Sequence, residues 1–267
     1  MTRVMGILNT TPDSFSDGGL WADRDRAVEH ALAMVEAGAD IIDVGGESTR
    51  PGARSVGIQE ELDRVVPVVE AIVARTAVTV SVDTSKPAVM VAAVAAGAGL
   101  INDVFALRQE GALETAADLG VPVCLMHMQG RPRDMQTDPH YADVVSEVEA
   151  FLVDRALACE AAGIDRDRIL VDPGFGFGKT LEHNIELFRG LPRLCGGAYP
   201  VLVGVSRKSM LGALTGKPVE DRLAASVAAA VLAAGHGAAV LRVHDVAATV
   251  DALKVLRVLE TGTRCSG

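Results

Sequence analysis

The stretch PVLVGVS at residues 200–206, read together with AVLRVH at residues 239–244, decides the fold. Each is a short run of β-branched and small apolar residues, which is typical of a strand buried on both faces of a parallel sheet. Cations close both runs, because Arg207 and Lys208 follow the first and Arg242 and His244 end the second. Arg242 and His244 are two residues apart, so on a strand both side chains point to the same side. Burying such a pair without an anion is unfavourable, and we therefore expect an anionic ligand at these strand ends.

Eight runs of this strand type alternate with helical patterns along the chain. The strand runs are residues 4–9, 41–46, 79–84, 100–104, 122–128, 169–174, 201–206 and 239–244. The helical patterns are residues 23–37, 58–73, 87–96, 111–119, 144–162, 181–191, 221–234 and 246–259. Eight alternations in 267 residues predict an α/β fold of the (β/α)8 TIM-barrel type, with the active site at the C-terminal ends of the strands. The alternative to the barrel is a doubly wound open sheet. In either case we expect residues 1–267 to form a single domain.

Composition and charge limit the kinds of molecule that the protein is expected to bind. Hydrophobic residues make up 49% of the chain and aromatic residues 3%, and small aliphatic side chains suit helices packed closely on a parallel sheet. The net charge of −10 argues against a general binder of nucleic acid or of membrane surfaces, because it provides no broad cationic field. Any anion site must therefore be local.

The cysteines and the apolar segments indicate a cytoplasmic location. The four cysteines show no CxxC or Cys/His spacing, which fits reduced thiols. The N-terminus enters a strand pattern at once, without the cationic region and apolar core of a signal peptide. The long uncharged stretch 223–241 is cut by Gly235 and Gly237, so it predicts a buried helix and a strand, and no membrane partner is expected.

Polar residues stand at or just beyond the C-terminal end of every strand run. They are Asn9, Glu47, Asp83, Asn102, His127, Asp172, Lys208, and Arg242 with His244. A closed barrel brings these ends to one mouth, which is where enzymes of this architecture have their sites. The loops TTPDSFSDGG at residues 10–19 and ESTRPGARS at residues 47–55 are long and rich in turn residues. They are suited to cover a ligand at the mouth, although ordinary surface turns have the same composition.

The run DPGFGFGKT at residues 172–180 resembles a phosphate-binding loop but fails the motif. Gly174 and Gly178 are separated by three residues instead of four, and Pro173 occupies the position that requires glycine. The run is an equally poor dinucleotide fingerprint, because no acidic residue follows at the required place. We interpret it as a tight strand-to-helix turn that holds Asp172 and Phe177 at the mouth.

Three acceptor side chains from different strands suggest the kind of ligand. Asp83, Asn102 and Asp172 favour a ligand edge rich in N–H donors, such as an amino-pyrimidine, over a phosphate. Pairing of these carboxylates with Lys or Arg is the structural alternative. Lys208 fits either a Schiff-base lysine or a charged hydrogen-bond donor, and nearby acids favour the charged donor.

Metal-binding patterns are sparse in this sequence. His127 is interpreted as a satisfied core histidine, and no histidine pair has metal-ligand spacing, so a protein-held zinc is not expected. Asn9 and Asp17 are suited to hold Mg²⁺ together with the phosphate oxygens of a ligand, because Mg²⁺ prefers few protein oxygens plus phosphates and water.

Eight motifs, spread over the whole chain in order, resemble one known family. They are MGILNTTPDSFSDGG (5–19), DVGGESTRPGA (43–53), SVDTSKP (81–87), IND (101–103), LMHMQG (125–130), DPGFGFGK (172–179), SRKS (206–209) and RVHD (242–245). The sequence resembles the dihydropteroate synthase family of the folate pathway, with no departure at a motif position. The resemblance implies a homodimer, formed through late helices, that joins 6-hydroxymethyl-7,8-dihydropterin pyrophosphate to p-aminobenzoate and releases pyrophosphate with Mg²⁺.

The resemblance also implies roles for individual residues, with catalysis by Asp83, Asp172, Lys208, Arg242 and His244. The pterin would contact Asp83, Asn102, Met126, Asp172, Gly204 and Lys208. Asn9, Thr49, Arg50, Arg242 and His244 would bind the pyrophosphate, with Asn9 and Asp17 placing Mg²⁺. The p-aminobenzoate pocket would be bordered by Phe15, Pro51, Phe177 and Ser209.

The implied chemistry favours a dissociative, SN1-like substitution. An aromatic amine is already neutral at pH 7, so the difficult step is breaking the carbon–oxygen bond to diphosphate, which cations and Mg²⁺ would stabilise. A pterin-binding methyltransferase is an alternative, but it has no use for a diphosphate-binding pair such as Arg242 and His244. A non-catalytic pterin-binding protein is another, and it would bind without turnover.

Overall fold

A closed barrel of parallel strands forms the centre of the protein. The computed structural model describes residues 2–10, 20–48 and 55–261. Within them the strands are β1 (Arg3–Asn9), β2 (Ile41–Gly45), β3 (Thr79–Asp83), β4 (Leu100–Asp103), β5 (Val123–Met126), β6 (Ile169–Asp172), β7 (Leu202–Val203) and β8 (Val240–Val243). Their order is β6-β5-β4-β3-β2-β1-β8-β7, and a parallel bridge between Val171 and Val201 joins the two ends. The predicted (β/α)8 barrel is confirmed, and the open-sheet alternative is wrong.

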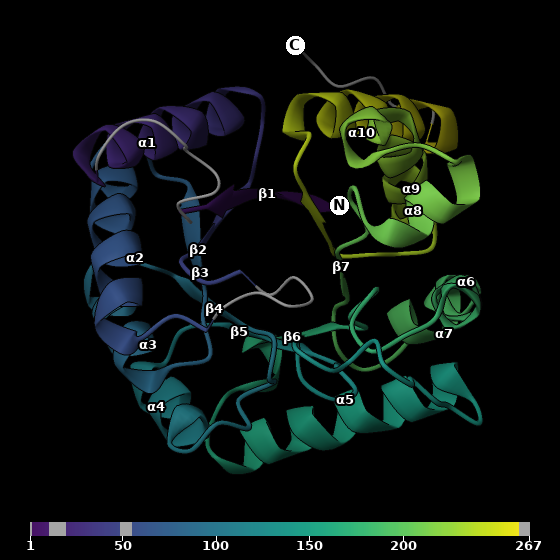
Figure 1. Cartoon of the computed structure of the whole chain (residues 1–267), viewed down its shortest axis with the longest axis horizontal. Coiled ribbons are helices and arrows are strands. Elements are labelled where there is room, and N and C mark those ends of the chain that lie inside the picture. Colours follow the sequence, from purple (N-terminus) through teal and green to yellow (C-terminus); the bar gives the residue numbers. More distant parts are fainter. Residues whose placement is uncertain (1, 11–19, 49–54, 262–267) are drawn as a thin grey trace.

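Helices surround this barrel as an outer ring (Figure 1). They are α1 (Leu20–Glu36), α2 (Ile58–Val73), α3 (Pro87–Ala95), α4 (Ala112–Leu119), α5 (Val144–Ala161), α6 (Leu181–Arg189), α7 (Leu191–Cys195), α8 (Ser209–Thr215), α9 (Leu223–Gly235) and α10 (Val246–Thr261). Two 3₁₀ turns, η2 (Arg166–Arg168) and η3 (Val219–Asp221), precede β6 and α9. Each predicted helix is present, but α7 and α8 were not predicted. Both are too short to develop the 3.6-residue apolar period, and Pro192 near the start of α7 separates it from α6.

Several predicted strands extend past their observed ends. The run 169–174 ends at Asp172, and Gly174, two residues further on, has a φ of +68°. The run 201–206 keeps only Leu202 and Val203 in the ladder, besides the bridge at Val201. The remaining residues of these runs belong to the loops at the mouth. Ser206 is therefore a rim residue and not part of the ladder.

The period-two alternation of the strands divides the barrel interior into layers. One inward layer is apolar and consists of Met5, Ile41, Leu100, Cys124, Leu170, Leu202 and Val240. The residues that follow these in each strand, such as Ile42, Ile101 and Leu241, belong to the larger core shared with the helices. Two residues further along, the next inward positions are Ile7, Asp43, Asn102, Met126, Asp172, Gly204 and Arg242. The strand pleat therefore collects polar side chains at the C-terminal end of the barrel.

Two further expectations can be compared with the described residues. None of their helices combines the length and the hydropathy that a membrane-spanning segment requires. Cys124, Cys159 and Cys195 are free thiols. The cytoplasmic location stays a prediction.

Candidate active site

Arg242 lies at the centre of a buried cluster of carboxylates. Its Nε donates to Asp43 Oδ2 at 2.6 Å, and its Nη2 donates to Asp83 Oδ2 at 2.8 Å. Asn102 Nδ2 donates to the same Asp43 oxygen at 3.1 Å. Residues from β2, β3, β4 and β8 therefore meet in one network at the mouth.

The prediction that Arg242 requires an anionic ligand is incomplete, because the protein itself supplies anions. Asp43 and Asp83 pair with the guanidinium from positions 199 and 159 residues away in the chain. Although burial alone lowers the pKa of Arg242, the two ion pairs outweigh that effect and raise it. The arginine is therefore a permanently charged group held in a fixed orientation.

A second group of side chains forms around Lys208. Its Nζ donates to the carbonyl of Phe175 and lies 4.7 Å from the ring centroid of Phe177. Asp172 accepts a hydrogen bond from the backbone N–H of Gly174 at 2.7 Å. A Cβ added to Gly204 would lie 3.8 Å from Arg242 Cβ and 4.0 Å from Lys208 Nζ. Gly204 thus lies between the two groups, and its missing side chain leaves room beside both of them.

Burial moves the pKa values of these groups towards the neutral range. It raises the pKa of Asp83 to about 7, against the opposing effect of Arg242. It also raises the pKa of Asp172, which Lys208 opposes. The pKa of Lys208 falls to about 8, because burial outweighs the attraction of Asp172. Lys208 is therefore mostly an ammonium at pH 7, which supports the charged donor over the Schiff-base lysine.

The ends of β7 and β8 are joined to each other at the rim. His244 donates its backbone N–H to Ser206 Oγ at 3.2 Å, and its ring Nδ1 lies 3.1 Å from the same oxygen. Arg207 donates Nε to Asp245 Oδ2 at 2.9 Å and Nη2 to Oδ1 at 2.5 Å. Arg207 has a φ of +58°, a conformation that L residues rarely adopt, and this ion pair helps to hold it.

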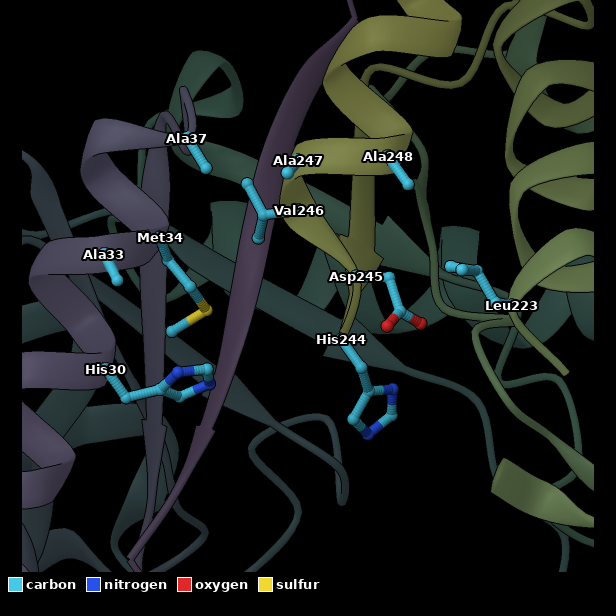
Figure 2. A pocket seen from close by; sticks show the side chains of 10 residues that line it. All are labelled: His30, Ala33, Met34, Ala37, Leu223, His244, Asp245, Val246, Ala247 and Ala248. Carbon is cyan, nitrogen blue, oxygen red and sulfur yellow. The ribbon is translucent and has the colours of Figure 1, made fainter. Parts of the chain in front are cut away.

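His244 therefore lies in different surroundings from Arg242. Its side chain faces a cavity of about 290 Å³ between α1 and the start of α10, with His30 and Met34 of α1 on the opposite side (Figure 2). Arg242 lies inside the barrel among carboxylates. Arg242 is part of β8 and belongs to the interior, whereas His244 follows the strand and belongs to the rim. The strand alternation that predicts a common direction for the two side chains therefore ends before His244.

The 172–180 run is the tight turn that the sequence predicts. Gly174, Gly176 and Gly178 have φ values of +68°, +80° and +61°. A Cβ on Gly174 would lie 1.9 Å from the carbonyl oxygen of His127, so glycine is required there. His127 is a satisfied core histidine, as expected, with Nδ1 2.9 Å from Lys179 Nζ.

The remaining predicted residues fall into three groups. Asn9 ends β1 beside Asp83, because a Cβ on Gly45 would lie 3.9 Å from Asn9 Oδ1 and 3.7 Å from Asp83 Oδ2. Met126 belongs to an apolar cluster against which Phe177 packs, and Ser209 is the exposed first residue of α8. The predicted residues Phe15, Asp17, Thr49, Arg50 and Pro51 lie outside the described residues.

Sequence reasoning missed Asp43 and misjudged Glu47. Asp43 follows the inward residue Ile41 by two positions, so strand periodicity alone places it on the interior face, where it pairs with Arg242. Glu47 does not join this network: it accepts the N–H of Val56 at 3.1 Å and forms an ion pair with Lys86. Lys86 also pairs with the buried Glu61.

Comparison with known proteins gives the family. The family model described as pterin binding enzyme matches residues 5–244. Dihydropteroate synthase of Escherichia coli is 54% identical over 254 residues, which cover 95% of this chain and 90% of that protein. The chain belongs to the dihydropteroate synthase family. Members of the dihydropteroate synthase family are transferases, and this chain is one.

Solved structures of dihydropteroate synthase agree with this assignment. The Xanthomonas albilineans enzyme with 4-aminobenzoic acid is 60% identical and has a TM-score of 0.93, covering 97% of this chain and 93% of that one. The same enzyme in complex with 7,8-dihydropteroate is 57% identical with a TM-score of 0.89, covering 97% and 94%. The match extends over the whole dihydropteroate synthase barrel, so every element that carries the candidate site is included.

Proposed function

We propose that the protein condenses 6-hydroxymethyl-7,8-dihydropterin pyrophosphate with p-aminobenzoate to give 7,8-dihydropteroate and pyrophosphate. The observation that carries this proposal is the meeting of hydrogen-bond acceptors and cations at one barrel mouth. Asp83, Asn102 and Asp172 supply the acceptors, and Lys208 and Arg242 supply the charge. The relatives with 4-aminobenzoic acid and 7,8-dihydropteroate support the same substrate classes.

The pterin fits the polar inner layer. Its amino-pyrimidine edge carries N–H donors, which the carboxylate of Asp172 and the oxygens of Asp83 and Asn102 would accept. Lys208 would donate to an acceptor on the same ring system. Met126 and Phe177 belong to one apolar cluster next to this layer and would contact the flat face of the heterocycle and the aromatic amine.

The diphosphate would lie towards Arg242 and His244. Arg242 keeps its charge and its orientation through Asp43 and Asp83, so its field at the leaving group would require no reorganisation during reaction. His244, fixed at the rim by Ser206, would add a second donor. The amide oxygen of Asn9 is the type of hard donor that Mg²⁺ accepts alongside phosphate oxygens, and bound there Mg²⁺ would neutralise diphosphate charge.

The same arrangement favours dissociative, SN1-like substitution. The bond between the pterin methylene carbon and the diphosphate oxygen would break first, and the oxygen would keep the electron pair. Asp172 and Asp83 would stabilise the resulting pterin cation, which the electron-rich ring shares. The amine nitrogen of p-aminobenzoate would then form the new bond and lose a proton to solvent.

A dissociative mechanism predicts slow hydrolysis of the pterin pyrophosphate when p-aminobenzoate is absent. Water would trap the cation that the departing diphosphate leaves behind. The measurement is chromatography of 6-hydroxymethyl-dihydropterin formed by the enzyme, with Asp172→Asn as the control that should form less. Complete absence of the alcohol over many turnover times would contradict the dissociative order.

The reaction itself is tested by a coupled pyrophosphate assay. Pyrophosphate should be released at the full rate when both substrates are present and only slowly when p-aminobenzoate is left out. Chelation of Mg²⁺ should abolish most of the release. A pterin-binding methyltransferase would release none. A non-catalytic pterin-binding protein would bind the pterin in calorimetry but leave both substrates unchanged.

We also propose that the protein is a homodimer formed through its late helices. Large apolar side chains are exposed there, including Leu214 of α8 and Leu232 of α9, each 56% accessible. A contiguous patch of such side chains on α8 and α9 would form the interface. Sedimentation equilibrium should give about twice the chain mass of 27.8 kDa, and Leu214→Glu with Leu232→Glu should give one chain mass. Wild-type protein at a single chain mass would exclude the dimer.

A further inference from the structure

The turn between β6 and α6 uses side chains to satisfy its carbonyl groups. From residue 174 to residue 179 every carbonyl oxygen accepts a side-chain hydrogen bond. The donors are Lys179 Nζ to Gly174 O and Phe177 O, Lys208 Nζ to Phe175 O, Gln136 Nε2 to Gly176 O, Tyr141 Oη to Gly178 O, and Asn184 Nδ2 to Lys179 O. A phosphate-binding loop instead directs its N–H groups at the ligand. This turn is a fixed wall of the site.

Lys179 makes the most demanding of these contacts. The residue is 3% exposed, and its Nζ lies 2.9 Å from Gly174 O, 3.1 Å from Phe177 O and 2.9 Å from His127 Nδ1. An ammonium group has three hydrogens, so these three acceptors match it one for one. The match requires His127 to be neutral, with its proton on Nε2.

The surroundings of His127 meet that requirement. Burial, together with the charge of Lys179, lowers the pKa of His127 to about 3. The ring packs edge-on against Phe151 at 4.9 Å between centroids, which leaves Nδ1 directed at the lysine. Burial also lowers the pKa of Lys179 to about 7, and Asp172 opposes this shift. The three acceptors and the carboxylate of Asp172 therefore stabilise the charged form of Lys179.

Lys179 and Lys208 bind the same turn: the buried Lys179 binds two of its carbonyl groups, and Lys208 binds another. Phe175 O accepts from Lys208, and the Phe177 ring lies beneath its ammonium. Gly174 and Phe177, whose carbonyls Lys179 binds, flank these contacts. We propose that Lys179 is a positioning residue, which fixes the 174–177 turn and thereby sets the Phe177 ring and the place of Lys208 in the site. This inference rests on the proposed function.

The proposal makes a selective kinetic prediction. Asp83, Asn102 and Asp172, three of the polar pterin contacts, are held by strands. Among the polar pterin contacts, Lys208 and Asp172 also bind the turn, through one hydrogen bond each. The Phe177 side of the p-aminobenzoate pocket is instead part of the turn itself. In Lys179→Met the KM for p-aminobenzoate should rise about 10-fold more than the KM for the pterin pyrophosphate, as a displaced contact surface would cause. Lys217→Met removes an exposed lysine and is the matched control, with both KM values unchanged. A lysine with only a structural role would lower the melting temperature without changing the ratio of the two KM values.

Hydrogen–deuterium exchange gives a second readout that needs no substrate. Exchange in the 173–180 peptide should be faster in Lys179→Met than in wild type or Lys217→Met. If Lys179→Met does not fold, His127→Phe keeps an aromatic ring in the same place but removes the Nδ1 acceptor, and it should change the KM ratio in the same direction by about 3-fold. Unchanged exchange and an unchanged KM ratio would overturn the proposal. Absence of pyrophosphate release by the wild-type protein would instead refute the proposed function.

Discussion

Replacement of Arg242 by alanine is expected to lower turnover by about 10²-fold or more, on the scale of losing one preorganised electrostatic contact. The guanidinium charge would no longer act on the departing diphosphate. The change would also leave the carboxylates of Asp43 and Asp83 buried without their counter-charge, and the free energy of unfolding should fall by about 3–5 kcal/mol. Steady-state kinetics and urea unfolding measure the two effects separately.

A double variant separates stability from catalysis. Adding Asp43→Asn to Arg242→Ala removes one uncompensated charge and should recover part of the lost stability. Turnover should stay low, because the missing charge at the leaving group is not restored. Recovery of wild-type turnover in the double variant, or unchanged turnover in a folded Arg242→Ala protein, would refute the role of Arg242 in diphosphate departure.

The pH dependence of kcat/KM for the pterin substrate is expected to be bell-shaped, with its optimum between the pKa of Asp83, about 7, and that of Lys208, about 8. Below the optimum Asp83 becomes protonated and no longer accepts N–H donors with both oxygens. Above it Lys208 loses the charge with which it would bind the ring. Initial rates at low pterin concentration, from pH 5.5 to pH 9.5, measure the curve.

Two variants assign the limbs of this curve. Asp83→Asn should lower kcat/KM by about 10²-fold at the optimum and remove the acid limb, because an amide presents an N–H where the ligand also has one. Lys208→Arg should move the basic limb beyond the measured range, since arginine stays protonated. If both limbs persist in both variants, the two groups do not control recognition.

The raised pKa of Asp83 also affects folding stability. Between about pH 4, where an unfolded aspartate titrates, and about pH 7, the folded state binds more protons at this position than the unfolded chain does. Its contribution to the free energy of unfolding therefore decreases as pH rises through that window. Asp83→Asn should flatten this part of the stability curve.

The fold was predictable because strand and helix periods are local properties of the sequence. The eight strand runs, among them 79–84 and 169–174, predicted the barrel and the position of its mouth, and the motifs led to the family. The partners of Arg242 were not predictable in the same way, because pairing between positions 43 and 242 depends on closure of the barrel. The inward position of Asp43 could have been predicted, because side chains two residues apart on a strand point to the same side. The acceptors of Lys179 could not, because they depend on the path of a turn with three left-handed glycines.

Arg242 is separated from its carboxylates by most of the chain, and this has a consequence for biosynthesis. Until the ribosome has made β8, the acidic side chains of β2 and β3 have no arginine to pair with, and β1 has no neighbour on one side. A nascent or truncated chain that stops before β8 would therefore carry both unneutralised charge and an open sheet edge. Such fragments should be substrates for chaperones and proteases, and quality control would discard them before any partial catalyst accumulates.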